Sequence, residues 1–321
     1  EMTVKGEKLW KNISPILEQE DYPIANIKLL RDNNVIEIEK WFEKVYDDDP
    51  SLSDLDDALK REGVSEDEIA TLTARQQKID KLVEIRLSTM SEEDKIKNIK
   101  ILSETQVRSG ATSFKFTSVT DEIKNGGFVV LENGNVKTEN DNIVLPKYDE
   151  AGRRITYTMK EQPINGYISK IEPGSQKLIN EYNGGRKLKF TVTKHWSGME
   201  NEKVFPTITF TLHQVFRINK GTEQQPNYKY YVYNQFKRDI RVNKDDDYTV
   251  TFGDDAHKAE SEALRYYSPI GEPFIYFITE TLSNYDGEQA IFIDPKYADY
   301  IQKYLEPFTN TSKTKYFIHF K

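Results

Sequence analysis

The feature that most constrains the fold of this 321-residue chain is a pair of strand patterns, each of which occurs twice. A Lys-x-Trp triplet in an apparent strand occurs at Lys8–Trp10 and again at Lys194–Trp196. An alternating strand that ends on a glutamate occurs at residues 155–161 and again at residues 274–280. Alternation of apolar and polar residues with a period of two is typical of strands with one buried face. The repeated order therefore predicts two tandem β-domains of the same kind.

The position of the boundary between the two domains follows from glycine placement. Asn183-Gly184-Gly185 comes after the last strand of the first copy and before the first strand of the second copy. Paired glycines commonly interrupt regular elements. We therefore predict domains at residues 1–184 and 185–321, both mainly β.

One segment of the first domain has a different period. Residues 35–108 carry 19 acidic and 12 basic side chains, so almost all of the net charge of −8 lies there. Ser65 is followed three residues later by Glu68, which is the spacing of a capping box at a helix start, and Ser91 begins a similar pattern. Apolar residues then recur every three, four or seven positions, as on a one-sided helix. We predict a helical bundle at about 35–108, inserted in the first β-domain.

Composition excludes several classes of function. A net charge of −8 argues against binding to nucleic acid, which needs clustered positive charge. The absence of cysteine excludes disulfides, thiolate metal sites and cysteine nucleophiles. No apolar run approaches the roughly 20 residues that span a bilayer, so we expect no membrane partner. The chain begins at Glu1 without a signal sequence, and we interpret it as a piece of a longer protein.

The order of the strand segments resembles the B-type repeat (Cna B-type) of Gram-positive collagen adhesins, which is related to pilin domains. The segments that carry this resemblance in the first copy are 6–12, 27–32, 145–149, 155–161, Gly166-Tyr167 and Ile179-Asn180. The second copy resembles the repeat more loosely, through residues 194–196, 208–212, 248–252, 264–267 and 274–280. The resemblance covers the β parts of both halves and leaves out residues 35–108.

This resemblance implies a fold and a setting. The fold would be two tandem immunoglobulin-like, transthyretin-like β-sandwiches, and the first would carry the inserted α-helical bundle. The setting would be an extracellular, cell-wall-anchored surface protein or pilin involved in cell adhesion and virulence, with neighbouring domains of a longer surface protein or pilus as partners. Such repeats are mostly stalks, so we do not carry over collagen binding. No cofactor and no metal is implied.

The resemblance also implies an isopeptide bond in the first domain. Lys8 would be the nucleophile, Asn180 the electrophile and Glu161 the catalyst, in one autocatalytic turnover rather than as an enzyme. Burial lowers the pKa of a lysine and raises that of a glutamate, which allows a neutral amine to attack the carboxamide. The simpler interpretation is an ordinary ion pair between Lys8 and Glu161, with Asn180 capping an edge. Lys5 and Asn183 are nearby substitutes, each less well placed.

The second domain departs from this pattern. Lys194 and Glu280 correspond to the lysine and the glutamate of a possible second site. Aligning the last strands puts His319 in place of the asparagine, and an imidazole offers no amide carbon to attack. Asn310 is the nearest alternative, nine residues upstream. Without an asparagine, we expect Lys194 and Glu280 to form a buried ion pair.

The remaining candidate sites have simple structural interpretations. The four histidines (His195, His213, His257 and His319) lack metal-ligand spacing, and we expect them to be structural or exposed. The acidic runs at 47–57 and 245–247 lack a calcium-binding loop and are interpreted as solvated loops and turns. The tyrosine-rich run 228–233 fits a strand that is half core and half surface. Paired carboxylates of a hydrolase are a further alternative, but no nucleophile motif or cofactor loop accompanies them.

The inserted segment 35–108 is the strongest candidate for a specific binding function. Binding residues concentrate in expanded loops on a rigid scaffold. An acidic helical bundle would suit a basic patch on a host extracellular or plasma protein, or would simply brace the first domain. The sequence leaves these two roles open, and it does not identify a ligand, a pilus-polymerising lysine or the oligomeric state.

Overall fold

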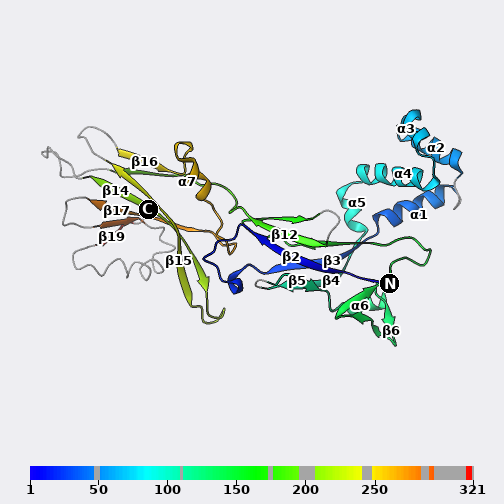
Figure 1. Cartoon of the computed structure of the whole chain (residues 1–321), viewed down its shortest axis with the longest axis horizontal. Helices are drawn as coiled ribbons and strands as arrows, with labels where there is room; N and C mark the ends of the chain where they lie inside the picture. The colour runs from blue at the N-terminus through cyan, green and yellow to red at the C-terminus, as the bar shows by residue number, and fades with distance from the viewer. Residues whose placement is uncertain are drawn as a thin grey trace. The chain divides into compact units, whose positions relative to one another are not determined.

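The computed structural model shows a mainly β protein with several sheets. It describes residues 1–46, 51–108, 111–172, 176–194, 207–240, 248–282, 289–292 and 316–319. Figure 1 shows the elements in chain order, from blue at the N-terminus to red at the C-terminus.

The strands of the first half form two larger sheets and two small ones. Their bounds are β1 Met2–Thr3, β2 Lys5–Lys11, β3 Ala25–Asp32, β4 Ile99–Val107, β5 Ser113–Lys115, β6 Leu131–Glu132, β7 Asn135–Val136, β8 Thr138–Glu139, β9 Asn142–Leu145, β10 Thr156–Glu161, β11 Tyr167–Ile171 and β12 Lys177–Tyr182. One sheet has the order β10-β3-β4, and another has the order β11-β12-β2-β5. The small sheets are β1-β9-β8 and β6-β7. The strand predicted at residues 155–161 is β10, and it pairs antiparallel with β3.

Five α-helices lie between β3 and β4. Their bounds are α1 Asn34–Tyr46, α2 Leu52–Arg61, α3 Glu66–Thr71, α4 Arg75–Thr89 and α5 Glu92–Lys97. The helix starts predicted at Ser65 and Ser91 are confirmed, because the Ser65 side chain accepts a hydrogen bond from the Glu68 amide and the Ser91 side chain accepts one from the Asp94 amide. A core of buried apolar residues joins α1, α2, α3 and α4, whereas α5 has no buried residue. The core contains Ile38, Phe42, Leu55, Ala58, Leu59, Ile69, Leu82 and Val83. Later in the described part of the chain come two further short helices, α6 (Asp121–Asn125) and α7 (Lys258–Ala263). The described 3-10 turns are η1 Gln19–Asp21 and η2 Asp255–His257.

The prediction of helix at the end of the segment 35–108 is wrong. Residues 99–107 form strand β4 rather than a helix, and helix α5 ends at Lys97. The apolar run Ile99, Ile101 and Leu102 suggested the face of a helix, but short apolar runs suit a buried strand as well. Pairing with β3 decides between the two, because eight residues of β3 pair with β4, from Ala25 opposite Val107 to Asp32 opposite Ile99.

The strands of the second half form two sheets. Their bounds are β13 Phe190–Lys194, β14 Ile208–Asn219, β15 Tyr228–Ile240, β16 Tyr248–Phe252, β17 Ile275–Leu282, β18 Gln289–Phe292 and β19 Tyr316–His319. One sheet pairs β13 with β16, and the other has the order β15-β14-β17-β18-β19. A core packs between the two sheets; its buried members are Ile208, Phe210, Leu212, Phe252 and Leu264.

By their contacts the residues form two compact units. The first comprises residues 1–9, 24–162 and 170–178, and the second comprises residues 10–23, 163–169 and 179–321. Strands β2, β11 and β12 each contribute residues to both units. The domain boundary predicted at 184/185 stays a prediction.

Aromatic residues organise part of the second unit. The Trp10 ring lies edge-on to Tyr167 at 5.3 Å, and Tyr167 lies edge-on to Tyr182 at 5.4 Å. The Tyr182 hydroxyl donates to the Tyr267 carbonyl oxygen at 2.7 Å. Burial raises the pKa of the phenols of Tyr167 and Tyr182 above its ordinary value, so these hydroxyls act as neutral donors.

Candidate functional site

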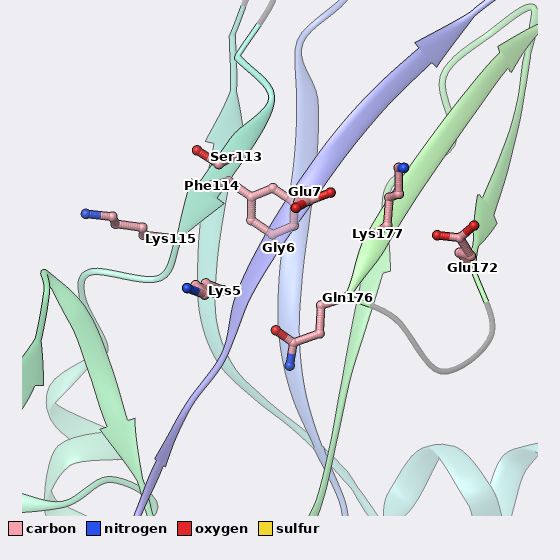
Figure 2. Close-up of a pocket in the computed structure, with 9 residues that line it drawn as sticks. All are labelled: Lys5, Gly6, Glu7, Ser113, Phe114, Lys115, Glu172, Gln176 and Lys177. Carbon is pink, nitrogen blue, oxygen red and sulfur yellow. The ribbon is translucent and has the colours of Figure 1, made fainter.

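Strand β2 presents Lys8 on a buried face. Gly6 and Lys8 are buried while Lys5 and Glu7 are exposed, which is the alternation of a strand with one face in the core. The Phe114 ring of β5 lies directly over Gly6, where an added Cβ would come within 2.0 Å of the ring. Only glycine permits this approach, and the ring covers the sheet two residues from Lys8 on the same face (Figure 2).

A carboxylate from the other large sheet meets Lys8 in the interior. The Lys8 Nζ donates to Glu161 Oε2 at 2.6 Å, and the two side chains are 0% and 2% exposed. Glu161 is the last residue of β10, where it pairs in register with Ile27 of β3. The end of the strand therefore holds the carboxylate in place. The fold brings together Lys8 and Glu161, which the sequence analysis predicted to pair although they are 153 positions apart.

Burial changes the proton affinity of this pair. Desolvation lowers the pKa of Lys8 below its ordinary value, and the hydrogen bond and charge of Glu161 oppose that shift. A lysine with a lowered pKa gives up its proton more easily, and the acceptor for that proton is already within hydrogen-bond distance.

Asn180 lies on the strand next to Lys8. It belongs to β12, which is the neighbour of β2 in the β11-β12-β2-β5 sheet. Its side chain is buried, with 0% of the residue exposed. The Ser169 hydroxyl of β11 donates to Asn180 Oδ1 at 2.8 Å. The three predicted residues therefore sit on β2, β10 and β12, and all three are buried.

The two substitute residues have other surroundings. Lys5 is exposed on β2 and lines a surface pocket. Asn183 Oδ1 accepts from the Gly185 backbone amide at 2.9 Å, so this side chain shapes a turn. Among these four candidates, Lys8 and Asn180 are the two with fully buried side chains.

A similar ion pair occurs in the second half. Lys194 Nζ of β13 donates to Glu280 Oε1 of β17 at 2.8 Å, with side-chain exposures of 21% and 6%. The backbone of His319 lies in β19, whose paired neighbour is β18, while β13 pairs with β16. Asn310 lies outside the described residues. The predicted ion pair between Lys194 and Glu280 is present.

The histidines that the structure describes have structural surroundings. The His213 ring is stacked on Phe277 at 4.5 Å, and its nitrogens lie 2.9 Å from Thr279 Oγ1 and 3.0 Å from Gln235 Nε2. Burial lowers the pKa of His213 to about 4. His257 is exposed and lies beside Asp254. Within the described residues there is no group of acidic or histidine side chains that would hold a metal ion.

The other predicted features are placed as follows. Asp54 completes a capping box with the N-cap residue Ser51 at the start of helix α2, and Asp56 forms an ion pair with Lys78. His195 and the runs 47–49 and 245–247 lie outside the described residues. The tyrosine-rich run is strand β15, in which exposure varies along the strand.

A surface pocket of about 370 Å³ lies at the edge of the same sheet (Figure 2). It is bordered by β2, β5, β12 and the residues Glu172 and Gln176. Its charged residues are Lys5, Glu7, Lys115, Glu172 and Lys177. Both signs of charge are present, so the lining favours no particular ligand. The buried Lys8 pair is not part of the lining.

Ser169 is a residue of the site that the sequence did not reveal. It lies in β11 (Tyr167–Ile171), a strand whose residues are mostly exposed. Its contact with Asn180 depends on which strand neighbours β12, which neither periodicity nor spacing defines. Ser169 and Asn180 are eleven residues apart in the sequence, and the signal that could have found the contact is the pairing of these two successive strands.

Comparison with known families bears on this site. Residues 73–181 match the family model of the Cna protein B-type domain. This match confirms the predicted family for residues 73–181, which are about a third of the chain. The matched residues include Glu161 and Asn180. They do not include Lys8, which precedes the match. The match also begins inside the segment 35–108, which the resemblance seen in the sequence had left out.

Domains of this type are typical of extracellular surface proteins. No curated protein and no solved structure matches the chain. Among the helices in the described part of the chain, none has the length and apolar character needed to cross a membrane.

Proposed function

We propose that this chain is a mechanically stable stalk or adhesive module of a Gram-positive surface adhesin or pilin, anchored to the cell wall. Its two halves are proposed to be tandem β-sandwiches, of which the first carries helices α1–α5 as an insertion. An autocatalytic isopeptide bond between Lys8 and Asn180 stabilises the first. The observation that carries this proposal is the buried Lys8–Glu161 pair, with a fully buried asparagine on the adjacent strand.

The chemistry needs no cofactor. A proton passes from Lys8 Nζ to the Glu161 carboxylate, and the neutral amine attacks Cγ of Asn180. The lone pair of Nζ forms the Nζ–Cγ bond, and the π electron pair of the Cγ–Oδ1 double bond moves to Oδ1. Glu161 accepts the second amine proton as it returns the first to Nδ2. The electron pair on Oδ1 then re-forms the carbonyl, the Cγ–Nδ2 bond breaks, and ammonia leaves. Holding the two groups in place supplies an effective concentration that free amines and amides lack.

Burial of all three side chains favours this proposal over an ordinary ion pair. Desolvating an ammonium and a carboxylate costs several kcal/mol per ion, so a buried pair alone is a weak source of stability. A buried carboxamide beside it needs hydrogen-bond partners as well. Once the amide bond has formed, neither the ammonium nor the free carboxamide has to be desolvated. The buried residues Lys8, Glu161 and Asn180 then stabilise the folded state.

The placement of the bond suits a load-bearing module. It would join β2, at the start of the first domain, to β12, at its end, which are neighbours in one sheet. Force applied along the chain would reach the bond before it reached most of the domain between the two strands. In the second half we propose that Lys194 and Glu280 remain an ion pair.

The intact mass of the denatured protein tests this proposal. The expected result is a mass deficit of one ammonia in the wild-type protein and none in Lys8→Met or Glu161→Gln. A deficit of two would show that Lys194 has found an asparagine in the second half. No deficit would overturn the proposed bond, and a deficit that persists in Lys8→Met would assign it to another lysine.

The alternative function is binding of a host extracellular or plasma protein through the helical segment. The observation that favours it is an exposed aromatic site on that segment: Trp41 is 39% exposed, and the Arg86 guanidinium lies 3.6 Å from its ring centre. Aromatic and arginine side chains are enriched at binding hot spots.

The geometry of the sheet allows a clean deletion. Asp32 and Ile99 pair directly across β3 and β4, and the Asn33 amide donates to the Asn98 carbonyl oxygen at 3.0 Å. Residues 34–97 can therefore be replaced by a two-residue turn that keeps the strand pairing. Binding of both proteins to purified matrix and plasma proteins is then compared by biolayer interferometry. Loss of binding on deletion supports the alternative, and unchanged binding or none in either protein supports the stalk.

A further inference from the structure

The hydrogen bond from Ser169 to Asn180 points to a further catalytic residue for the proposed cross-link. The Ser169 hydroxyl donates to Oδ1 of Asn180 at 2.8 Å, and Oδ1 is the atom that receives the electron pair when the amine attacks. We infer that Ser169 polarises the Asn180 carboxamide and stabilises the oxyanion of the tetrahedral intermediate. This inference rests on the proposed function and adds a residue to it.

The strand arrangement explains how Ser169 reaches that atom. β11 and β12 are neighbours in the sheet, and β12 has β2 on its other side. The carboxamide of Asn180 thus lies on a strand flanked by one that carries the nucleophile and one that carries the donor. A serine hydroxyl has one proton to donate, and a carbonyl oxygen has two lone pairs, so the contact leaves room for a second donor at Oδ1.

The contact also has consequences for orientation. A carboxamide has an oxygen and a nitrogen of similar size, and a donor that touches one of them selects which way the group is turned. With Oδ1 held by Ser169, Nδ2 faces the other way. The leaving nitrogen is then kept apart from the hydroxyl, and in the proposed reaction it receives its proton from Glu161. The same hydrogen bond therefore serves the attack and the departure of ammonia.

The exposure of the two residues sets the size of the effect. Asn180 is fully buried, whereas Ser169 lies on an exposed strand. A donor in a water-excluded oxyanion site is worth a factor of roughly 100 or more in rate, whereas a neutral hydrogen bond open to water is worth a factor of roughly 2 to 10. Because Ser169 is accessible to water, we expect its removal to slow bond formation by about tenfold rather than to abolish it.

The test is a time course of bond formation. The full chain is made by cell-free translation, translation is stopped, and samples are denatured at intervals for intact-mass measurement of the ammonia loss. Ser169→Ala is expected to react about tenfold more slowly than wild type, and Ser169→Thr, which keeps the hydroxyl, close to the wild-type rate. Thr158→Ala on β10 serves as the control, because it removes a hydroxyl from an exposed strand position that does not contact Asn180.

The outcomes separate this inference from the proposal on which it rests. Equal rates for Ser169→Ala and wild type overturn the role of Ser169 and leave the cross-link in place. Equal slowing by Ser169→Ala and Ser169→Thr also overturns it, because the hydroxyl would then not be the active group. No ammonia loss in any protein overturns the proposed bond itself. To show that slowing does not come from misfolding, Tm is compared for Glu161→Gln with and without Ser169→Ala; a large drop in Tm would assign the effect to folding and overturn the inference.

Discussion

The stabilising effect of the cross-link is the most demanding quantitative consequence of the proposed function. Asn180→Ala removes the electrophile and leaves the Lys8–Glu161 ion pair in place. The bond would close a loop of about 170 residues between Lys8 and Asn180. The chain-entropy relation for cross-links gives about 5 kcal/mol of stabilisation for a loop of that length.

Asn180→Ala has local costs besides the loss of the bond. It removes the hydrogen bond from Ser169 and leaves a small cavity at a fully buried position, which together cost about 1–3 kcal/mol. The same substitution is therefore made in a Lys8→Met/Glu161→Gln background, which cannot form the bond and has no charge at these two buried positions. In that background only the local costs remain, and the difference between the two effects isolates the cross-link.

The free energy of unfolding is measured for the four proteins by guanidinium denaturation followed by fluorescence and circular dichroism. We expect Asn180→Ala to cost about 5 kcal/mol more in the wild-type background than in the Lys8→Met/Glu161→Gln background. Intact masses of the same samples show which proteins carry the bond. Equal costs in the two backgrounds, to within about 1 kcal/mol, would refute the reasoning.

Three further predictions concern single side chains. Gly6→Ala should destabilise the first unit by about 1–3 kcal/mol, because the added Cβ meets the Phe114 ring, and Gly6→Ala/Phe114→Leu should recover part of the loss in thermal denaturation. Because burial lowers the pKa of His213 to about 4, the neutral imidazole contributes fully to the free energy of unfolding above pH 6.5, and this contribution of up to about 3 kcal/mol is lost as the pH falls toward 4. Urea titrations between pH 7 and 4 should show this decrease, and the same decrease in His213→Gln would contradict the assignment. Asp56→Ala should destabilise the helical segment by about 1–3 kcal/mol, because Lys78 is 5% exposed and would keep only the Ile69 carbonyl oxygen at 3.4 Å; an unchanged far-ultraviolet melting curve would argue against it.

The elements with a clear period were predictable from the sequence. The strand that ends on Glu161 was located by alternation alone, and the helix starts at Ser65 and Ser91 were located by capping spacing. Both signals are local, because they depend on which side chains fall on one face of a single element. The pairing of Lys8 with Glu161 was predicted through the resemblance to the B-type repeat rather than through a local pattern.

The parts that the sequence did not reveal depend on pairing between distant strands. Residues 99–107 form a strand because β3 offers a partner, and their apolar run alone fits a helix equally well. The contact of Ser169 with Asn180 needs β11 to lie beside β12. The approach of Phe114 to Gly6 needs β5 to lie beside β2, and a glycine in a strand is by itself consistent with several other causes.

The central claim is a covalent bond between two named atoms, and peptide mapping of the wild-type protein tests it most directly. A lysine in an amide bond resists trypsin, so cleavage after Lys5, Lys11, Lys177 and Arg186 should give one branched peptide that joins residues 6–11 to residues 178–186. Its mass should be the sum of the two peptides less one ammonia, and fragmentation should place the branch on Lys8 and Asn180. Two separate peptides, with cleavage after Lys8, would contradict the account; a branch at Lys5 or Asn183 would contradict the assignment of the residues.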